Sequence, residues 1–265
     1  MLLTANIGNS IISFGFFDEN HHMMATFCVS CDVGRTSDEY LAVVRSIARE
    51  KGIRREEAQG AILSSVVPSL TETIKKTIKE FWDPEPMVVG PGVKTGFHLK
   101  IDNPSELGGD MVANTAAAIR LKRVDHAALI ADLGMVNTLS AVSRDGDFLG
   151  CAIYPGVELS LNALRGETAQ LPTVNVGGTP KAIGKNTQGS VRGGVILGGA
   201  VTLEGLVRRF ASEMKIPLEE LDLIATGQSA EDVLPYCRCP FTVVSDLTLR
   251  GLSYIYHHNL DHNRH

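Results

Sequence analysis

The sequence predicts an α/β fold made of two similar halves. Strand-like and helix-like segments alternate along the chain, and one short loop motif occurs twice, about half a chain apart. The 265 residues are 44% hydrophobic and 21% charged, which is typical of a folded globular protein and enough for one large or two medium domains. These observations exclude a disordered chain, a coiled coil and a small disulfide-stapled scaffold.

The first half of the chain predicts three strands, a helix, a strand and a second helix. Short β-branched and aromatic runs separated by Gly and Asn turns indicate strands, and apolar residues at helical spacing indicate helices. In chain order we expect a hairpin over 2–17, a strand over 23–31, a helix capped by Ser37-Asp38-Glu39 and ended by Lys51-Gly52, a strand over 61–67 stopped by Pro68, and a helix over 70–82.

A junction separates the two halves. Residues 83–110 contain several Pro and Gly residues that break helices and strands, which predicts an irregular segment connecting two domains. We therefore divide the chain into domains 1–112 and 113–265. The second half then repeats the pattern of the first. We expect a helix over 111–122, strands near 127–134, 149–156 and 221–227, and helices over 157–164, 190–214 and the C-terminal end.

The repeated motif joins a strand to a tight turn. Thr4-Ala5-Asn6-Ile7-Gly8-Asn9-Ser10 aligns without gaps on Ile130-Ala131-Asp132-Leu133-Gly134-Met135-Val136, 126 residues later. A strand that ends in Asn or Asp, an apolar residue and Gly leaves backbone N–H groups pointing at one spot, which suits a phosphate. A carboxylate at the same place suits a hydrated divalent cation. Two such loops facing each other would hold a nucleotide, although each motif alone is also an ordinary hairpin turn.

A second candidate site is Asp110, which follows Gly108 and Gly109 on what we expect to be an exposed turn before a helix. Asp110 could simply cap that helix. It could equally act as the general base that takes a proton from a substrate hydroxyl during phosphoryl transfer, with Glu106 as a weaker candidate.

The charge of the chain argues for a small-molecule ligand. The net charge is −5 and the isoelectric point is near 5.9, so there is no general positive field to hold nucleic acid or an anionic membrane. No apolar run reaches the length that a bilayer requires, and the first residues lack the basic start of a signal peptide. We therefore expect a cytoplasmic protein.

Several motifs, taken in order, resemble those of the type III pantothenate kinase family over nearly the whole chain. They are the first hairpin from Asn6, Ser64 to Pro68, Asn103-Pro104 to Asp110, Asp132-Leu133-Gly134, Gly150 to Gly156, Gly184 to Thr187, Thr226-Gly227 and Leu247 to Leu252. The resemblance implies two ribonuclease-H-like domains with mixed sheets, as in the actin-like ATPases and the acetate and sugar kinases. It also implies a homodimer that phosphorylates pantothenate with ATP in the first step of coenzyme A biosynthesis.

The resemblance assigns a role to each motif. Asp110 would be the catalytic base, and Asp132 would hold a monovalent cation, K⁺ or NH₄⁺, beside the Mg²⁺ that accompanies ATP. ATP would contact the first hairpin and the second loop at Asn6, Ile7, Gly8, Asn9, Ser10, Ile11, Ile12, Ser13, Gly134 and Met135. Pantothenate would contact Ile101, Gly108, Gly109, Asp110, Met111 and Thr187. Thr187 would come from the partner subunit, so that two chains share one active site.

The chain departs from the family pattern at several of these positions. Asn6 stands where the family has Asp, which weakens the expected Mg²⁺ site because an amide brings no charge. Met111 stands where the family has an Arg that would bind the substrate carboxylate. Ile101 replaces Tyr, Met135 replaces Thr, and Gln228 replaces a Gly.

Two functions therefore compete, and a purely structural duplication with no ligand is the third and least favoured interpretation. The leading one is an ATP-dependent kinase that acts on pantothenate or a related hydroxyl compound. The alternative is a catalytically impaired relative that acts as a ligand-binding or regulatory protein. Loss of one charged contact to a transferring phosphoryl group costs about 3 kcal/mol, or roughly a hundredfold in rate, so several such losses would favour the alternative.

Overall fold

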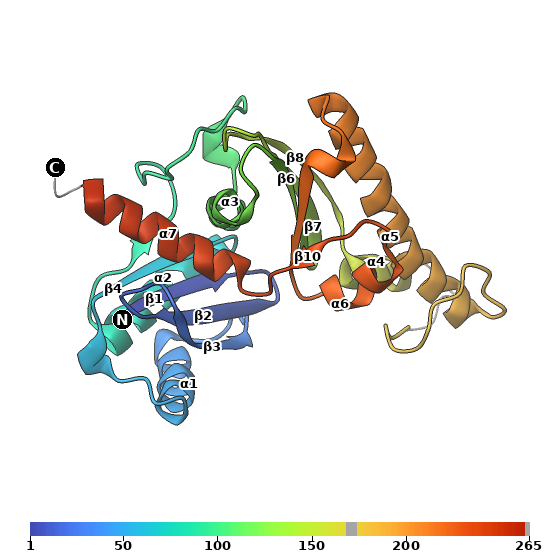
Figure 1. Ribbon diagram of the computed structural model, residues 1–265. Helices are drawn as coiled ribbons and strands as arrows, with labels where there is room; N and C mark the ends of the chain where they lie inside the picture. Colours follow the sequence, from blue (N-terminus) through green and yellow to red (C-terminus); the bar gives the residue numbers. More distant parts are fainter. Residues whose placement is uncertain (168–173, 263–265) are drawn as a thin grey trace. The chain divides into compact units, whose positions relative to one another are not determined.

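Two five-stranded mixed sheets organise the chain in the computed structural model, which describes residues 1–167 and 174–262 (Figure 1). The first compact unit comprises Met1–His98, Asp102–Arg120 and Asp246–His265, and the second comprises Leu99–Ile101 and Leu121–Ser245. The units thus follow packing rather than chain order, because the C-terminal segment belongs to the first. The division after residue 112 stays a prediction.

The sheet of the first unit has the strand order β3-β2-β1-β4-β5. Its first three strands are antiparallel neighbours, and β4 and β5 run parallel to β1. The strands are β1 (Leu2–Ile7), β2 (Ile11–Phe17), β3 (Met23–Ser30), β4 (Gly60–Ser65) and β5 (Met87–Val88). The helices of this unit are α1 (Ser37–Glu50), α2 (Pro68–Trp82), α3 (Gly109–Leu121) and α7 (Leu247–His262), with 3₁₀ turns η1 (Arg55–Glu57) and η2 (Pro104–Glu106).

Helices cover both faces of this sheet because side chains alternate along each strand. Leu3, Ala5 and Ile7 point to the face that packs on α1 and α2. Leu2, on the opposite face, joins apolar residues of α3 and α7. Figure 1 shows α1 and α7 on opposite sides of the sheet. The result is a three-layer unit with the sheet in the middle.

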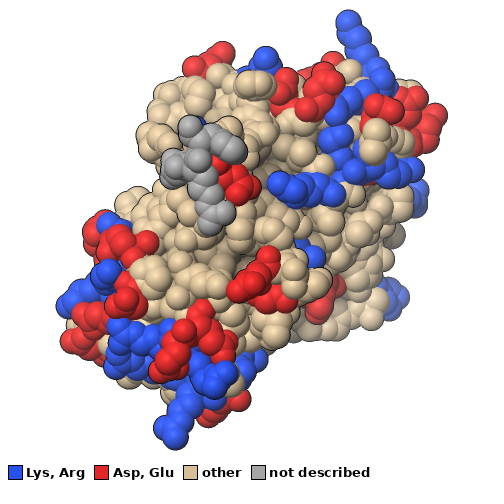
Figure 2. All heavy atoms as spheres, turned by 60° about the vertical axis from the view of Figure 1, so that its left-hand side comes forward, with Lys and Arg blue, Asp and Glu red and all other residues tan. Residues whose placement is uncertain are grey.

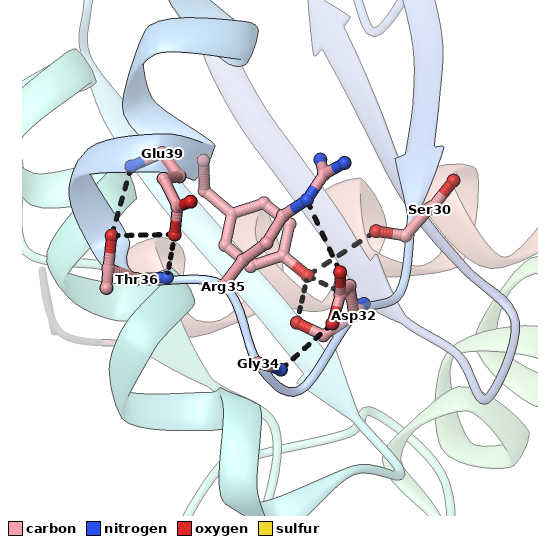
Figure 3. Close-up of polar contacts among 7 residues, drawn as sticks. Ser30, Asp32, Gly34, Arg35, Thr36 and Glu39 are labelled. Atoms are coloured by element: carbon pink, nitrogen blue, oxygen red, sulfur yellow. Dashed lines mark hydrogen bonds and ion pairs between the residues drawn. The ribbon is translucent and has the colours of Figure 1, made fainter.

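Helix α1 begins one residue earlier than the sequence suggests. Thr36, not Ser37-Asp38-Glu39, is the N-cap: its Oγ1 accepts a hydrogen bond from the Glu39 N–H, and the Glu39 carboxylate accepts from the Thr36 N–H at 2.7 Å (Figure 3). This reciprocal capping box satisfies two backbone donors that the helix itself cannot. The preceding loop is fixed by Asp32, whose carboxylate accepts from the Gly34 N–H at 2.9 Å and lies 3.6 Å from Arg35.

The second unit repeats this plan with the strand order β10-β9-β6-β7-β8. Its strands are β6 (Ala127–Leu133), β7 (Val136–Val142), β8 (Phe148–Pro155), β9 (Leu221–Thr226) and β10 (Thr242–Val243). Its helices are α4 (Val157–Gly166), α5 (Thr187–Met214) and α6 (Ala230–Val233), with 3₁₀ turns η3 (Leu218–Glu220) and η4 (Leu234–Tyr236). Apolar residues of α5 and α6 pack on one face of β6 and β9 in a single buried cluster.

The two sheets have the same topology, which confirms the predicted fold class and its duplication. In each, an antiparallel run of three strands precedes a strand that pairs in parallel with the first. Asn6 and Asp132 occupy the same place, one residue before the end of the first strand. The turns differ in length: Gly8–Ser10 joins β1 to β2, whereas only Gly134 and Met135 join β6 to β7.

Charged side chains of both signs are intermingled on the face seen in Figure 2, in keeping with the modest net charge. Helix α5 is the one helix in the described ranges that is long and apolar enough to cross a membrane, with a mean hydropathy of 1.3 over its best window. A single helix of this kind is weak support for a membrane span, because helices of soluble proteins meet the same criterion.

Candidate functional site

In the first unit the candidate site starts where β1 and β4 end side by side. The parallel register pairs Asn6 with Ser64, and the Ser64 hydroxyl donates a hydrogen bond to Asn6 Oδ1 at 2.8 Å. Ser64 is fully buried, so this hydrogen bond holds the Asn6 amide in one orientation. The motif beginning at Ser64 is visible in the sequence, but its role is not, because only the strand register shows which residue faces Asn6.

The first turn of α3 lies beside Ser64. A Cβ at Gly109 would come 3.1 Å from Ser64 Cβ, and a Cβ at Gly108 would come 2.6 Å from Asp110 Oδ1. Gly109 is therefore needed for space against the sheet, whereas a Cβ at Gly108 would meet mainly the Asp110 carboxylate; neither glycine has a positive φ. They let the start of the helix approach the sheet so that Asn6, Ser64 and Asp110 belong to one locality.

Asp110 is placed differently from the exposed turn that the sequence suggests. It lies within the first turn of α3 and is mostly buried, and its Oδ1 accepts a hydrogen bond from the Met111 N–H at 2.7 Å. Burial raises the pKa of its carboxyl, and backbone N–H groups of Met111 and of Asp110 itself oppose that shift only in part. A carboxyl with a raised pKa is better matched to accepting a proton near neutrality.

The loop of the first hairpin offers two free backbone donors. The Gly8 N–H is already bonded to Ile11 O at 2.9 Å, which closes the turn. Within the described residues, the N–H groups of Asn9 and Ser10 have no such partner. Ile7 and Ile12 are fully buried, so any ligand contact from these two residues must come from the backbone. Ser13 pairs with Asn6 across the hairpin, and its Oγ lies 3.4 Å from Cys28 Sγ.

The corresponding loop of the second unit is built by close backbone contacts. Asp132 pairs with Thr138 on one side and with Thr226 on the other. Gly156 donates its N–H to Met135 O at 2.9 Å, and a Cβ there would come 1.9 Å from Gly134 O. Gly156 therefore permits an approach that no other residue would allow.

A cluster of oxygen atoms surrounds this second loop, and the sequence did not predict two of its members. Asn137 is 2% exposed and Tyr154 stands opposite it on β8, where the Tyr154 phenol interacts with the Asn137 side chain. Burial raises the pKa of Tyr154 to about 12, so its phenol remains protonated. In the sequence, Asn137 could have been recognised as a candidate site residue because it is a polar residue at a strand position that faces the core.

The remaining predicted residues are divided between the two units. Met111 lies with Asp110 in the first unit, whereas Ile101 lies in the second beside a short bridge between Leu99 and Phe148. Thr187 is exposed in the first turn of α5, just after the N-cap Asn186. Gln228 is exposed after Gly227, whose φ of +97° and contact with Leu133 O leave no room for a side chain.

Metal-binding groups are sparse in the described ranges. They contain no group of three or more His, Cys, Asp or Glu side chains arranged to hold a metal ion. The carbonyl oxygens of Gly134 and Met135 and Asn137 Oδ1 gather instead around Gly156 as an oxygen-rich set of low charge, whereas Asp132 lies on the other face of β6 from the side that Asn137 shares. Such a donor set suits a monovalent cation better than a bare divalent one.

Comparison with solved structures supports the fold alone, since sequence identities are low. A protein from Campylobacter jejuni described as a Baf family transcriptional activator superposes with a TM-score of 0.60 at 19% identity, covering 98% of this chain and 99% of that one. The activator of 2-hydroxyisocaproyl-CoA dehydratase from Clostridium difficile, solved with bound ADPNP, has a TM-score of 0.53 at 9% identity, covering 100% and 97%.

Comparison of sequences is more specific. The family model for type III pantothenate kinase matches residues 2–209. The type III pantothenate kinase of Moorella thermoacetica is 36% identical over 259 residues, which is 98% of this chain and all of that protein. The type III pantothenate kinase of Dehalococcoides mccartyi is 35% identical over 258 residues, covering 97% of this chain and 96% of the relative. The chain therefore belongs to the type III pantothenate kinase family.

Proposed function

We propose that this protein transfers the γ-phosphoryl group of ATP to the hydroxyl of pantothenate, in the first step of coenzyme A biosynthesis. Family membership over nearly the whole chain supports this activity and does not favour the alternative of a non-catalytic relative. The structural observation that carries the proposal is Asp110, a mostly buried carboxyl with a raised pKa at the start of α3, next to the ends of β1 and β4.

Asp110 acts as the general base. As the hydroxyl oxygen bonds to the γ-phosphorus and the bond to the β-phosphate oxygen breaks, the hydroxyl proton passes to the Asp110 carboxylate and ADP leaves. Within the described residues Asp110 has no ion-pair partner. No neighbouring cation therefore stabilises its charged form, and the carboxylate retains its basicity.

The first hairpin binds the phosphates. The N–H groups of Asn9 and Ser10 are free to donate to phosphate oxygens, and the Asn6 amide, oriented by Ser64, faces the same loop. When Mg²⁺ is bound with ATP it would neutralise charge on the transferring group, and Asn6 would offer it a neutral amide oxygen rather than a carboxylate. We infer that the hold on Mg²⁺ from this position is weak and that the phosphates supply much of its coordination.

Asp132 is our candidate for the monovalent cation, K⁺ or NH₄⁺. Its place, one residue before the end of β6, matches the place of Asn6 in the first unit. Bound there, the cation supplies positive charge to the second loop. Thr187, exposed at the start of α5, is the candidate contact from the partner subunit in a homodimer with a shared active site. We place this activity in the cytoplasm, where ATP is available.

The proposal is tested by acceptor-dependent ADP release. The purified protein is incubated with ATP, Mg²⁺ and KCl, with or without pantothenate, and the products are identified by mass spectrometry. We expect ADP to appear only with pantothenate and in equal amount with a phosphorylated product. A parallel reaction with pantetheine, which lacks the carboxylate, tests the effect of Met111 on acceptor choice. No ADP with either acceptor, at any concentration of K⁺, would contradict the proposal.

A further inference from the structure

A cavity lies in the second unit, at the end of its sheet opposite to the loop at Gly134. It has a volume of about 720 Å³ and is formed by residues before β6, the first residues of β9, the C-terminal part of α5 and the segment leading into β10. Because β6 and β9 are parallel, both begin at this end and finish at the loop end. The lining extends along β9 as far as Ile224, which pairs with Ile130, and three residue steps of about 10 Å in total separate Ile130 from Leu133 before the candidate nucleotide loop.

The floor of the cavity is apolar. It is lined by Leu121, Val207, Leu221, Leu223, Pro240 and Val244. Only two residues of β10 pair with β9, at Ile224 and Ala225, which leaves the start of β9 open beside this floor. A cavity of this volume is within the usual range for a small-molecule site, about 300–1,000 Å³.

The rim carries more positive than negative charge. Three arginines, Arg123, Arg208 and Arg238, line the cavity with two carboxylates, Glu219 and Asp222. Arg123 is neutralised, since its guanidinium lies 2.6 Å from Asp222 Oδ1 and its backbone N–H also donates to Asp222.

The other two arginines are free to bind a ligand. Across residues 1–167 and 174–262, no carboxylate lies within ion-pair distance of the Arg208 or Arg238 guanidinium. The Glu204 carboxylate accepts a hydrogen bond from the Arg238 backbone N–H at 2.8 Å. Burial raises the pKa of Cys239, which also lines the cavity, to about 11, so its thiol adds no negative charge. Among the residues that the structure describes, the guanidinium groups of Arg208 and Arg238 are thus the unpaired cationic groups of the cavity, with Glu219 and Glu204 as nearby carboxylates.

We propose that this cavity is a binding site for an amphipathic anion, with an alkyl or acyl group on the apolar floor and a carboxylate or phosphate at Arg208 and Arg238. Burial of the apolar part gives affinity, because each CH₂ removed from water contributes favourably. The arginines select the charge of the head group. This site is additional to the kinase reaction and does not depend on it.

The chain offers two matched pairs of variants. Thr242 lines the cavity whereas its neighbour Val243 does not, and both are exposed on β10. Arg208 lines the cavity whereas the adjacent exposed Arg209 does not. Thr242→Trp should fill the cavity and Arg208→Ala should remove a head-group contact, with Val243→Trp and Arg209→Ala as controls.

Binding is measured by isothermal titration calorimetry on the full chain without ATP, using octanoate, octyl phosphate, octanol and octylammonium. We expect octanoate or octyl phosphate to bind the wild type more tightly than octanol, and octylammonium to bind least. Arg208→Ala should weaken the anions roughly threefold, the scale of an exposed ion pair, and leave octanol unchanged. Thr242→Trp should abolish binding, and both controls should bind like the wild type.

Three results would overturn the proposal. The first is no binding of either anion to the wild type. The second is octanol or octylammonium binding as tightly as the anions. The third is unchanged binding by Thr242→Trp; if that variant also altered the oligomeric state in size-exclusion chromatography, the cavity wall would be a contact between copies of the chain. If Thr242→Trp does not fold, Arg208→Ala still tests whether the cavity selects its ligand by negative charge.

Discussion

At the scale of the single residue, the properties of Asp110 come from two small neighbours and a strand end. Gly108 and Gly109 let the first turn of α3 approach Ser64, and the approach buries the carboxyl. Burial makes the side chain a better base and at the same time makes its ionised form costly. Asp110 should therefore reduce the stability of the fold at neutral pH.

This cost gives a prediction for stability against pH. The folded pKa of Asp110 is raised above its unfolded value, so its contribution to stability is fully present below the unfolded pKa and is lost as pH rises through the folded pKa. Asp110→Asn cannot ionise and should raise the melting temperature at pH 7, with the difference shrinking towards pH 4. Thermal unfolding is compared with that of Asp102→Asn, an exposed residue of the same unit. A lower melting temperature for Asp110→Asn at pH 7 would show that the surroundings of the carboxylate stabilise its ionised form rather than destabilise it.

A second prediction at this scale concerns Asn6. Asn6→Asp retains an oxygen to accept from Ser64 Oγ and adds a negative charge beside the loop Gly8–Ser10. If Mg²⁺ is bound there, the variant should lower the KM for Mg·ATP about tenfold, which corresponds to roughly 1.4 kcal/mol. Steady-state kinetics over a range of Mg²⁺ concentrations measure this effect. Ser64→Ala should remove part of the gain, since the carboxylate loses its positioning bond. An unchanged Mg²⁺ dependence would count against Asn6 as a neighbour of the metal.

At the scale of the element, the crossing of α3 and α7 is set by one glycine. A Cβ at Gly251 would lie 1.8 Å from Ala113 O, so the two helices approach with backbone against backbone. Gly251→Ala must displace α7 and should cost about 3 kcal/mol or more, measured as a lower urea midpoint.

The matched control for this substitution is Gly205→Ala in α5. Gly205 is exposed, and a Cβ added there would have no neighbouring atom within 4 Å. The change should therefore stabilise the helix by about 0.5–1 kcal/mol, because alanine has the higher helix propensity. If both variants shift the midpoint equally, helix propensity and not the crossing would explain the result.

The elements also show what the sequence could and could not predict. Periodicity and turn residues located most strands and helices, and the alignment of Asn6 with Asp132 correctly matched equivalent strand ends. The capping residue Thr36, the burial of Asp110 and the role of Ser64 were missed, because each depends on a partner that the linear pattern does not reveal. A buried carboxyl and an exposed one look alike in a sequence.

At the scale of the whole molecule, the C-terminal helix completes the first unit. Leu249, Leu252 and Ile255 of α7 are buried against the first sheet and α3. Burying three such side chains contributes about 5–9 kcal/mol, which is comparable with the stability of an entire domain. Chain order alone would not connect α7 with β1, because more than two hundred residues separate them.

Removal of residues 246–265 should therefore unfold the first unit. Trp82 is the single tryptophan of the chain, is fully buried in this unit and donates its Nε1–H to Gly60 O at 2.9 Å, so its fluorescence reports on this unit. The truncated chain should show emission shifted to the red, as in water, whereas a chain ending at Asp261 should retain the emission of the intact protein. Buried-type emission after removal of α7 would mean that the first unit is stable without it.

We propose above that Asp110 takes the proton from pantothenate during phosphoryl transfer. The most direct measurement compares wild type and Asp110→Asn in single-turnover transfer from ATP to pantothenate, with binding of both ligands measured on the same samples. We expect Asp110→Asn to bind ATP and pantothenate with near wild-type affinity but to transfer the phosphoryl group at least a hundredfold more slowly. Transfer by Asp110→Asn at the wild-type rate would contradict it.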